Sequence, residues 1–311
     1  MRVLITGHNG FVGKALVQAM SEYSLHLVGR TPLENTDLPF FKKQLSADEN
    51  YRDSLEGVNV IIHAAARVHV MDDTSSDPLA AYRAVNVEGT LNLAQQAINA
   101  GVKRFIFISS IKVNGEATIP GKPFSAKDKI NPSDPYGISK AEAEQALQKL
   151  CVNSDMDLVI IRPPLVYGYG VKANFAAMLK LAKKNLPLPL GAITNRRSMV
   201  ALDNLIDLIK TCVIHPQAAN QIFLVSDDRD LSTTELVKLM VEAHGKSPRL
   251  LAVPMSWFYL LGKLTRKQAV ISRLCGSLQV DINATKSILN WQPPVSVEQG
   301  IRSCIPKEDL C

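Results

Sequence analysis

The chain has 311 residues, of which 46% are hydrophobic and 21% are charged, and its formal net charge is +6. This composition excludes a disordered or fibrous chain, and the length allows either two lobes or one large domain. The basic residues come as scattered pairs without a run, a stripe or a nucleic-acid-binding motif, so the positive charge favours a small anionic ligand over DNA or RNA.

Short apolar runs alternate with helical patterns along the first two thirds of the chain. The runs lie at residues 3–5, 25–28, 58–62, 105–108, 158–161 and 222–225, and the helical patterns at 14–23, 79–100 and 137–151. Runs that are apolar throughout predict strands buried on both faces, as in a parallel sheet. The alternation therefore predicts an α/β fold built on a Rossmann doubly wound parallel sheet.

The alternation ends after Arg162-Pro163-Pro164, where proline and glycine become frequent, and the sequence from residue 232 is mainly helical with loops. We interpret these parts as a smaller mixed lobe that binds the substrate. The predicted division assigns residues 1–168 and 200–227 to the domain that contains the parallel sheet, and residues 169–199 and 228–311 to the small lobe.

Three glycines at intervals of three follow the first strand, in Gly7-His-Asn-Gly10-Phe-Val-Gly13, and a helix begins near Phe11. Gly7 permits a tight turn, Gly10 allows phosphates to approach the backbone, and Gly13 lets helix and strand pack closely. The helix N-terminus adds free N–H groups and the positive end of a dipole. At the first strand-to-helix turn of an α/β chain, this pattern predicts a site for a dinucleotide pyrophosphate.

The second strand ends in Leu27-Val28-Gly29-Arg30, where NAD-binding proteins carry an acidic residue that binds the ribose 2′-hydroxyl. An arginine suits the extra phosphate of NADP because its planar fork of donors matches a phosphate. We therefore expect NADP or NAD, with a preference for NADP. Asp48 is a looser candidate for a position near the adenine.

A tyrosine and a lysine lie four residues apart, in Tyr136-Gly-Ile-Ser-Lys140, and therefore share one helix face. An ammonium group beside a phenol lowers the phenol's pKa, and Ser110 at the end of the fourth strand can bind the same substrate oxygen. These three residues predict a proton-transfer site beside a hydride carrier.

At this point the sequence resembles the extended short-chain dehydrogenase/reductases, in particular their branch of NAD-dependent epimerases and dehydratases that act on nucleotide sugars. The matching stretches are residues 6–13, 63–66, 86–90, 107–110, 136–140, 162–168 and 289–291. The resemblance implies that Ser110, Tyr136 and Lys140 form the catalytic triad. With the glycines and Arg30 included, the implied cofactor site consists of Gly7, Asn9, Gly10, Phe11, Val12, Gly13, Arg30, Ala64, Ala65, Ala66, Asn86, Tyr136, Lys140, Pro163 and Leu165. We assign no chemistry to His63.

Relatives similar to UDP-glucose 4-epimerase hold the nucleotide-sugar diphosphate with an asparagine and arginines. The corresponding residues here are Asn174, Arg197 and, as a second arginine, Arg273, and Lys112 is a further candidate substrate-binding residue. Guanidinium groups suit this task because they make bidentate, charge-assisted bonds to a pyrophosphate.

Differences between this chain and the residues usual in each branch of the family indicate which reaction it catalyses. Dehydratases carry an Asp-Glu pair where this chain has Ile111 and Lys112, and many epimerases carry an aromatic residue where it has Asn114. The chain looks similar to bacterial enzymes of surface-polysaccharide synthesis, including UDP-4-keto-6-deoxy-hexosamine 4-reductases. We therefore favour 4-keto reduction over the alternative, a UDP-hexose 4-epimerase that retains NAD. A third hypothesis, a dinucleotide sensor without activity, is disfavoured because Tyr136 and Lys140 are both present.

The same resemblance predicts a homodimer that forms through the helices at residues 79–100 and 135–151, where Ala141, Ala143 and Ala146 allow close packing. The beginning of the chain shows no signal-peptide pattern. Residues 250–264, the longest apolar stretch, are broken by Pro254 and too short to span a bilayer, so we expect a buried or interfacial helix there. The five cysteines form no CxxC pair, which predicts neither disulfides nor a bound metal. We expect a cytoplasmic protein.

Overall fold

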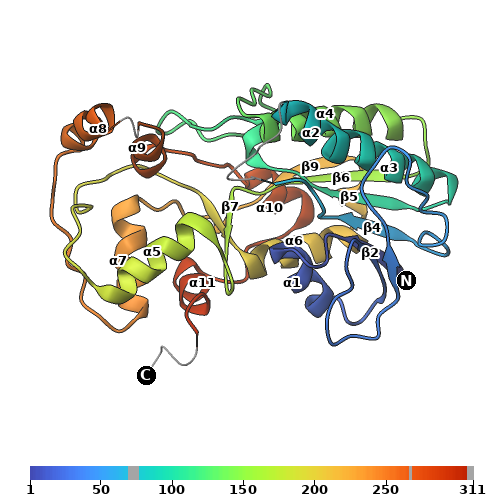
Figure 1. Cartoon of the computed structure of the whole chain (residues 1–311), viewed down its shortest axis with the longest axis horizontal. Helices are drawn as coiled ribbons and strands as arrows, with labels where there is room; N and C mark the ends of the chain where they lie inside the picture. The colour runs from blue at the N-terminus through green and yellow to red at the C-terminus, as the bar shows by residue number, and fades with distance from the viewer. Residues whose placement is uncertain (69–76, 266–267, 307–311) are drawn as a thin grey trace.

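The computed structural model describes residues 1–68, 77–265 and 268–306 of the chain. Figure 1 shows an elongated molecule, with a sheet-containing lobe at one end and a smaller helical lobe at the other. The short strand β7 (Leu165–Tyr167) lies between the two lobes and pairs with β8 (Met199–Ala201) in a separate two-stranded sheet.

The large lobe is built on a seven-stranded sheet in the order β3-β2-β1-β4-β5-β6-β9. Every pairing within it is parallel. The strands are β1 (Arg2–Thr6), β2 (Ser24–Gly29), β3 (Phe40–Lys42), β4 (Val60–His63), β5 (Arg104–Ile108), β6 (Asp157–Arg162) and β9 (Gln221–Leu224). The predicted Rossmann fold is confirmed, because this is the doubly wound strand order. Strand β3 is not among the predicted strands, because it has only three residues and lies at the edge of the sheet.

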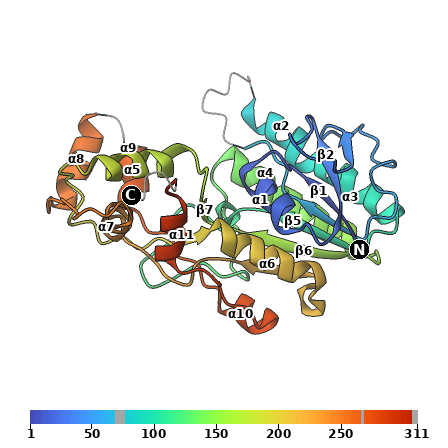
Figure 2. The same cartoon turned by 90° about the horizontal axis from the view of Figure 1, so that it is seen from below.

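Helices cover both faces of the sheet, as Figures 1 and 2 show. One face carries α1 (Phe11–Ala19) and α6 (Leu202–Ile214), and the other carries α2 (Pro78–Arg83), α3 (Thr90–Asn99) and α4 (Pro135–Cys151). Successive residues of β1 alternate between the two layers: Val3 and Ile5 pack with the α1–α6 side, and Leu4 with the α3–α4 side. The strands are apolar throughout because both of their faces are buried.

The predicted helix at residues 79–100 is present, but its centre is a π-helical turn, Ala84–Gly89, between α2 and α3. Such turns insert one residue into a helix and often mark functional sites. The turn contains Asn86, one of the predicted site residues. Gly89 is required there, because a β-carbon would lie 2.6 Å from the carbonyl carbon of Leu45.

The small lobe is mainly helical. Its helices are α5 (Ala173–Lys184), α7 (Thr233–Ala243), α8 (Met255–Leu264), α9 (Gln268–Cys275) and α11 (Val297–Ser303). The helix predicted for residues 250–264 begins only at Met255, directly after Pro254. The segment around α10 (Asn283–Leu289), which the sequence analysis assigned to this lobe, packs on the large lobe instead, and Trp291 donates a hydrogen bond of 2.7 Å to Asp207 on α6.

Ala141 and Ala143, proposed as dimer contacts, are 4% and 0% exposed within the single chain. Their small side chains let α4 pack against its own sheet, so these two residues are unavailable to a partner and that part of the prediction is wrong. The homodimer itself stays a prediction. Within the described parts of the chain, no helix combines the length and the apolarity that crossing a membrane requires.

Candidate active site

The glycine motif forms a tight turn between β1 and α1. Gly7 has a φ of +75°, and a β-carbon there would lie 2.6 Å from the backbone nitrogen of Ala65. A β-carbon on Gly13 would lie 2.0 Å from the carbonyl oxygen of Gly7. Gly10 is the N-cap residue of α1 and has no side chain that could accept a hydrogen bond. It therefore leaves the N–H groups of the first turn, including those of Phe11 and Val12, uncapped. This turn fits a pyrophosphate group.

The backbone of the loop after β4 packs directly on the glycine turn, at Ala64 and Ala65. The N–H of Ala65 donates to the hydroxyl oxygen of Thr6 (3.2 Å), and that hydroxyl lies 2.8 Å from Nδ1 of His63. Nε2 of His63 lies 2.9 Å from the hydroxyl of Thr90. Burial and the nearby charge of Lys140 lower the pKa of His63 to about 3, so the imidazole is neutral and structural.

A second contact joins the glycine turn to the end of β2. The side-chain amide of Asn9 donates to the carbonyl oxygen of Thr31 (2.7 Å), and Nε2 of His8 lies 2.9 Å from the same oxygen. The ring of buried His8 also lies against Gly29, where a β-carbon would be 2.8 Å from it. These contacts fix the backbone on both sides of Arg30, whose side chain is exposed.

Helix α4 carries the predicted tyrosine and lysine in its first two turns. It starts sharply, because Asp134 is the N-cap, accepting a 2.7 Å hydrogen bond from the N–H of Gly137, and Pro135 follows. Lys140 is only 2% exposed. Its Nζ donates to the carbonyl oxygen of Ile108 (2.8 Å) and lies 4.4 Å from the ring centre of Phe107. The lysine therefore reaches the end of β5, beside Ser110.

Burial lowers the pKa of Lys140 to about 7, against the opposing effect of the Glu144 carboxylate. The pKa of Tyr136 is raised, first by burial and then by Asp134 and Tyr82. This direction is opposite to the lowering predicted from the sequence. The physical reason is that the phenol lies among desolvating and negatively charged groups, while the ammonium of Lys140 is held by a backbone carbonyl.

The two serines after β5 have different roles. Ser110 is the N-cap of a short 3-10 helix, Ile111–Val113, and its Oγ accepts a hydrogen bond of 3.3 Å from the N–H of Lys112. Ser109 donates instead to the buried carboxylate of Glu144 on α4. Ser110 is the partly exposed member of the pair, which fits the substrate-facing role assigned to it.

A buried ion pair beneath these residues was not anticipated. Glu144 accepts hydrogen bonds from Arg162, with Nε at 3.0 Å and 3.1 Å from its two oxygens, and both side chains are 3% exposed. Nη1 of Arg162 donates to the side-chain oxygen of Asn114 (3.0 Å). The network ties α4 to the ends of β5 and β6. Its one sequence signal is that Glu144 lies four residues beyond Lys140, on the same helix face.

Asn86 also connects separate segments. Its side-chain nitrogen donates to the hydroxyl of Ser139 on α4 (3.0 Å), and its side-chain oxygen accepts from the N–H of Arg67 (2.8 Å). It therefore holds the loop after β4 against the residue that precedes Lys140. The carbonyl of Pro163 accepts a hydrogen bond from the N–H of Ile111 (3.0 Å).

The remaining predicted residues are distributed over both lobes and the strand between them. Leu165 begins β7 and is 44% exposed. Lys112 forms ion pairs with Asp134 and with Glu116 (3.4 Å), so it neutralises the N-cap carboxylate of α4. Asn174 is exposed in the first turn of α5.

Arg197 has the features of an anion site. Its Nη1 donates to the carbonyl oxygens of Arg273 (3.2 Å) and Gly276 (3.1 Å), and burial lowers its pKa. In the described parts of the chain, no carboxylate forms an ion pair with it. A partly buried guanidinium without a counterion favours an anionic ligand. The side chain of Arg273 itself is exposed on α9.

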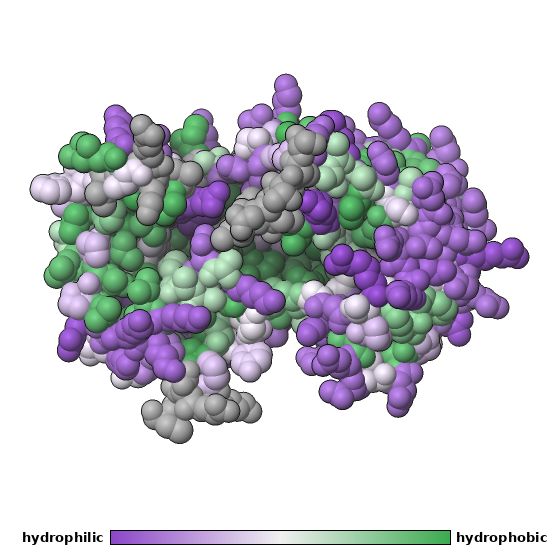
Figure 3. Space-filling model, in the orientation of Figure 1, coloured by the Kyte–Doolittle hydropathy of each residue, from purple (hydrophilic) through white to green (hydrophobic). Residues whose placement is uncertain are grey.

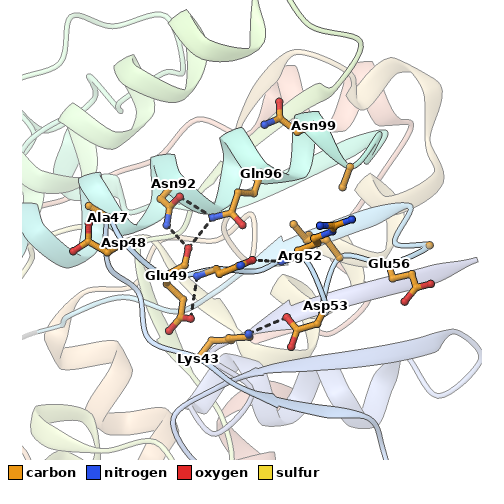
Figure 4. Close-up of a pocket in the computed structure, with 14 residues that line it drawn as sticks. Lys43, Ala47, Asp48, Glu49, Arg52, Asp53, Glu56, Asn92, Gln96 and Asn99 are labelled. Atoms are coloured by element: carbon orange, nitrogen blue, oxygen red, sulfur yellow. Dashed lines mark hydrogen bonds and ion pairs between the residues drawn. The ribbon is translucent and has the colours of Figure 1, made fainter.

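A cavity of about 1250 Å³ lies elsewhere, between α3 and the loop after β3. Figure 4 shows Asn92 and Gln96 on α3 directed toward Glu49, whose carbonyl accepts a hydrogen bond from each (2.8 and 2.7 Å). Asp48 lines this cavity. None of the predicted catalytic residues does so.

The parallel sheet brings the glycine turn, Ser110 and the start of α4 to one edge, where β1, β5 and β6 end, and Figure 3 shows a hollow between the two lobes. This arrangement is that of a Rossmann-type dinucleotide-binding enzyme. The model of the NAD dependent epimerase/dehydratase family matches residues 3–226. The chain belongs to that family.

Known proteins resemble the chain along nearly its whole length. A protein of Vibrio cholerae named UDP-glucose 4-epimerase is 49% identical over 305 residues, which cover 96% of this chain and 93% of that protein. An N-acetyl-alpha-D-glucosaminyl-diphospho-ditrans,octacis-undecaprenol 4-epimerase of Escherichia coli O157:H7 is 27% identical over 96% of this chain and 92% of its own. The solved structure of MoeE5 in complex with UDP-glucuronic acid and NAD has a TM-score of 0.77 at 21% identity, covering 98% of this chain and 97% of its own.

Proposed function

We propose that the protein is a UDP-hexose 4-epimerase that retains NAD. The observation that carries the proposal is the 49% identity, across both lobes, to a protein named UDP-glucose 4-epimerase. The E. coli relative is also named as a 4-epimerase, although its sugar is on a different carrier. These similarities favour the epimerase alternative over the 4-keto reduction that the sequence analysis preferred.

The residues of the chain supply proton transfer and positioning. The glycine turn formed by Gly7, Gly10 and Gly13 would hold NAD, which would supply reversible hydride transfer at the sugar. The deprotonated oxygen of Tyr136 takes the proton from the sugar 4-hydroxyl and, as the phenol, later gives it back, while Ser110 orients the sugar oxygen. Lys140 lies one helical turn beyond Tyr136 on α4, and the carbonyl oxygen of Ile108 holds its Nζ at the end of β5. Lys112 keeps the Asp134 carboxylate neutralised, which limits the rise that this carboxylate causes in the pKa of Tyr136.

The diphosphate of the substrate is assigned to the small lobe. Arg197 offers an unneutralised guanidinium, and Asn174 and Arg273 provide further donors from α5 and α9. A ligand held by residues of both lobes spans the hollow between them, so its hexose reaches Tyr136 at the edge of the sheet. Epimerisation would require that the hexose present both of its faces within this space.

The cofactor proposal follows the reaction. An epimerase recovers its cofactor in every turnover and therefore needs no separate supply of reduced NADPH. MoeE5 was solved with NAD, and the family is described as NAD dependent. We therefore propose NAD and treat the NADP preference drawn from Arg30 as unsupported.

The test is to incubate the purified protein with UDP-glucose and with UDP-N-acetylglucosamine, and to follow the sugar signals by NMR without added NADPH. Conversion to the 4-epimer with no net change in cofactor supports the proposal, and Tyr136→Phe abolishes it. Consumption of NADPH with a UDP-4-keto-6-deoxy-hexosamine, together with inert UDP-hexoses, overturns the proposal in favour of the reductase. Binding of NAD without turnover on any of these substrates assigns the protein as a sensor.

A further inference from the structure

Helix α8 of the small lobe turns an apolar stripe toward solvent. Trp257, Leu260 and Leu264 follow one another at spacings of three and four residues and therefore share one helix face. They are 67%, 56% and 74% exposed, respectively. On a surface helix of a globular protein this stripe normally faces the core. Its exposure identifies a face that is unpartnered within the chain.

The opposite side of α8 is packed. Phe258 is 9% exposed and lies in a small core cluster with Ile193 and Cys275. Gly262 allows α9 to approach, because a β-carbon there would lie 2.9 Å from the Ile271 side chain. The helix is therefore anchored by one apolar face and presents a second one outward.

Further exposed apolar side chains lie on α8, on α9 and in the segment before α8. We define the α8 surface as Leu251, Trp257, Tyr259, Leu260, Leu264 and Val270, which are 47% to 74% exposed. Figure 1 places α8 at the end of the small lobe that lies farthest from the sheet. Figure 3 shows hydrophobic residues gathered on this end of the molecule, whereas hydrophilic residues dominate the opposite end.

The stretch of sequence that carries the α8 surface has charged residues of one sign. Residues 243–280 contain no aspartate or glutamate, and neither do residues 169–199 of the same lobe; the acidic residues of α7 are Glu235 and Glu242. Lys263 on α8 and Arg249 before it are both exposed. A surface that combines exposed tryptophan, tyrosine and leucine with basic residues and no acid is complementary to anionic lipid headgroups.

We propose that the α8 surface docks on an anionic lipid bilayer and holds the small lobe at the membrane–water boundary. Leucine side chains of the stripe enter the outer acyl region, Trp257 and Tyr259 lie at headgroup level, and Lys263 reaches anionic headgroups. A protein partner fits less well, because lysine is depleted in protein interfaces and this surface projects from the end of the lobe. The inference concerns location and does not depend on the proposed reaction.

The chain provides its own fluorescent probe. It contains two tryptophans, and Trp291 is only 5% exposed whereas Trp257 is 67% exposed. Mixing the full-length protein with phosphatidylglycerol-containing vesicles will shift the emission of Trp257 to the blue, and bromine-labelled acyl chains will quench it. Phosphatidylcholine vesicles will give a much smaller response, and added salt will weaken binding to the anionic vesicles.

Sedimentation with vesicles gives the quantitative test. The triple variant Trp257→Ser/Leu260→Ser/Leu264→Ser will lower partitioning onto anionic vesicles at least about tenfold. Lys263→Gln will lower it about fivefold. The matched control replaces Ile119, Val152 and Ile214 with serine, since these side chains are similarly exposed (67%, 74% and 67%) on other elements, and it will bind like the unmodified protein.

Thermal melting and light scattering accompany these measurements and separate the outcomes. An unchanged melting temperature in the triple variant assigns its loss of binding to the surface rather than to unfolding. Equal binding by the triple variant and the control overturns the proposal, as does equal binding to neutral and anionic vesicles. Absence of vesicle binding together with a dimer that only the triple variant dissociates assigns the α8 surface to a second copy of the chain. None of these measurements depends on turnover. Failure of the docking proposal can therefore be distinguished from failure of the proposed function.

Discussion

Replacing Glu144 with glutamine tests whether the buried network beneath the catalytic residues holds the site together. Glu144 and Arg162 are each 3% exposed, and the carboxylate also accepts the hydroxyl of Ser109. The substitution keeps the shape of the side chain and removes its charge. The guanidinium of Arg162 then stays buried with only Asn114 and a neutral amide as partners.

The expected loss is large because the remaining charge is buried. Removing one partner of a buried ion pair costs about 3 to 5 kcal/mol in unfolding free energy. For a chain of this size, that loss corresponds to a fall in melting temperature of about 2 °C per kcal/mol, or about 6 to 10 °C. Glu144→Gln also removes the charge that opposes desolvation of Lys140, so the pKa of Lys140 falls further below about 7.

The assay is urea and thermal unfolding of Glu144→Gln beside Glu142→Gln. Glu142 lies on the same helix, but its ion pair with Arg83 is exposed (33% and 46%), so its loss will cost less than about 1 kcal/mol. The double variant Glu144→Leu/Arg162→Met removes both charges and will be more stable than Glu144→Gln. Equal stability of Glu144→Gln and Glu142→Gln would refute the reasoning. A double variant that is no more stable than Glu144→Gln would refute it as well.

Three further predictions address the cofactor loop, a buried histidine and the anion site. Because the pKa of His63 is lowered to about 3, the unfolded chain binds a proton below about pH 6 that the folded chain does not. The unfolding free energy therefore falls by about 1.4 kcal/mol per pH unit below about pH 6. His63→Gln will flatten this slope in denaturant titrations, and an unchanged slope contradicts the assignment. Gly13→Ala places a β-carbon 2.0 Å from the carbonyl oxygen of Gly7 and will lower the unfolding free energy by about 3 kcal/mol. Gly10→Ala places its β-carbon 3.1 Å from the same oxygen, so its melting temperature will be nearly normal. Calorimetry will show that Gly10→Ala binds NAD weakly. Arg197→Met will raise the KM for a UDP-sugar about thirtyfold with a smaller change in kcat, and a change confined to kcat would exclude a diphosphate role. Arg273→Met, at an exposed position, is the matched comparison.

Local patterns were sufficient for the parts of the protein that depend on neighbouring residues. The strand, the glycine turn and the helix that starts near Phe11 follow from steric rules within about ten residues, and the structure places Gly7 and Gly13 in the crowded positions that these rules predict. Continuous apolar runs predicted a sheet buried on both faces. The four-residue spacing of Tyr136 and Lys140 places them one helical turn apart wherever the helix lies.

The tertiary structure decided everything that depends on contacts between distant segments. The pairing of Glu144 with Arg162 and Asn114, and the use of Lys112 to neutralise Asp134, join residues whose proximity no local periodicity specifies. The pKa of Tyr136 moved opposite to expectation because burial and Asp134 act on it, and burial is a property of the folded chain. The same holds for α8: its apolar stripe is visible in the sequence, but only packing determines that Phe258 faces the core while Trp257 faces outward. Periodicity shows that a helix has an apolar face, and the surrounding fold determines which side of the helix is covered.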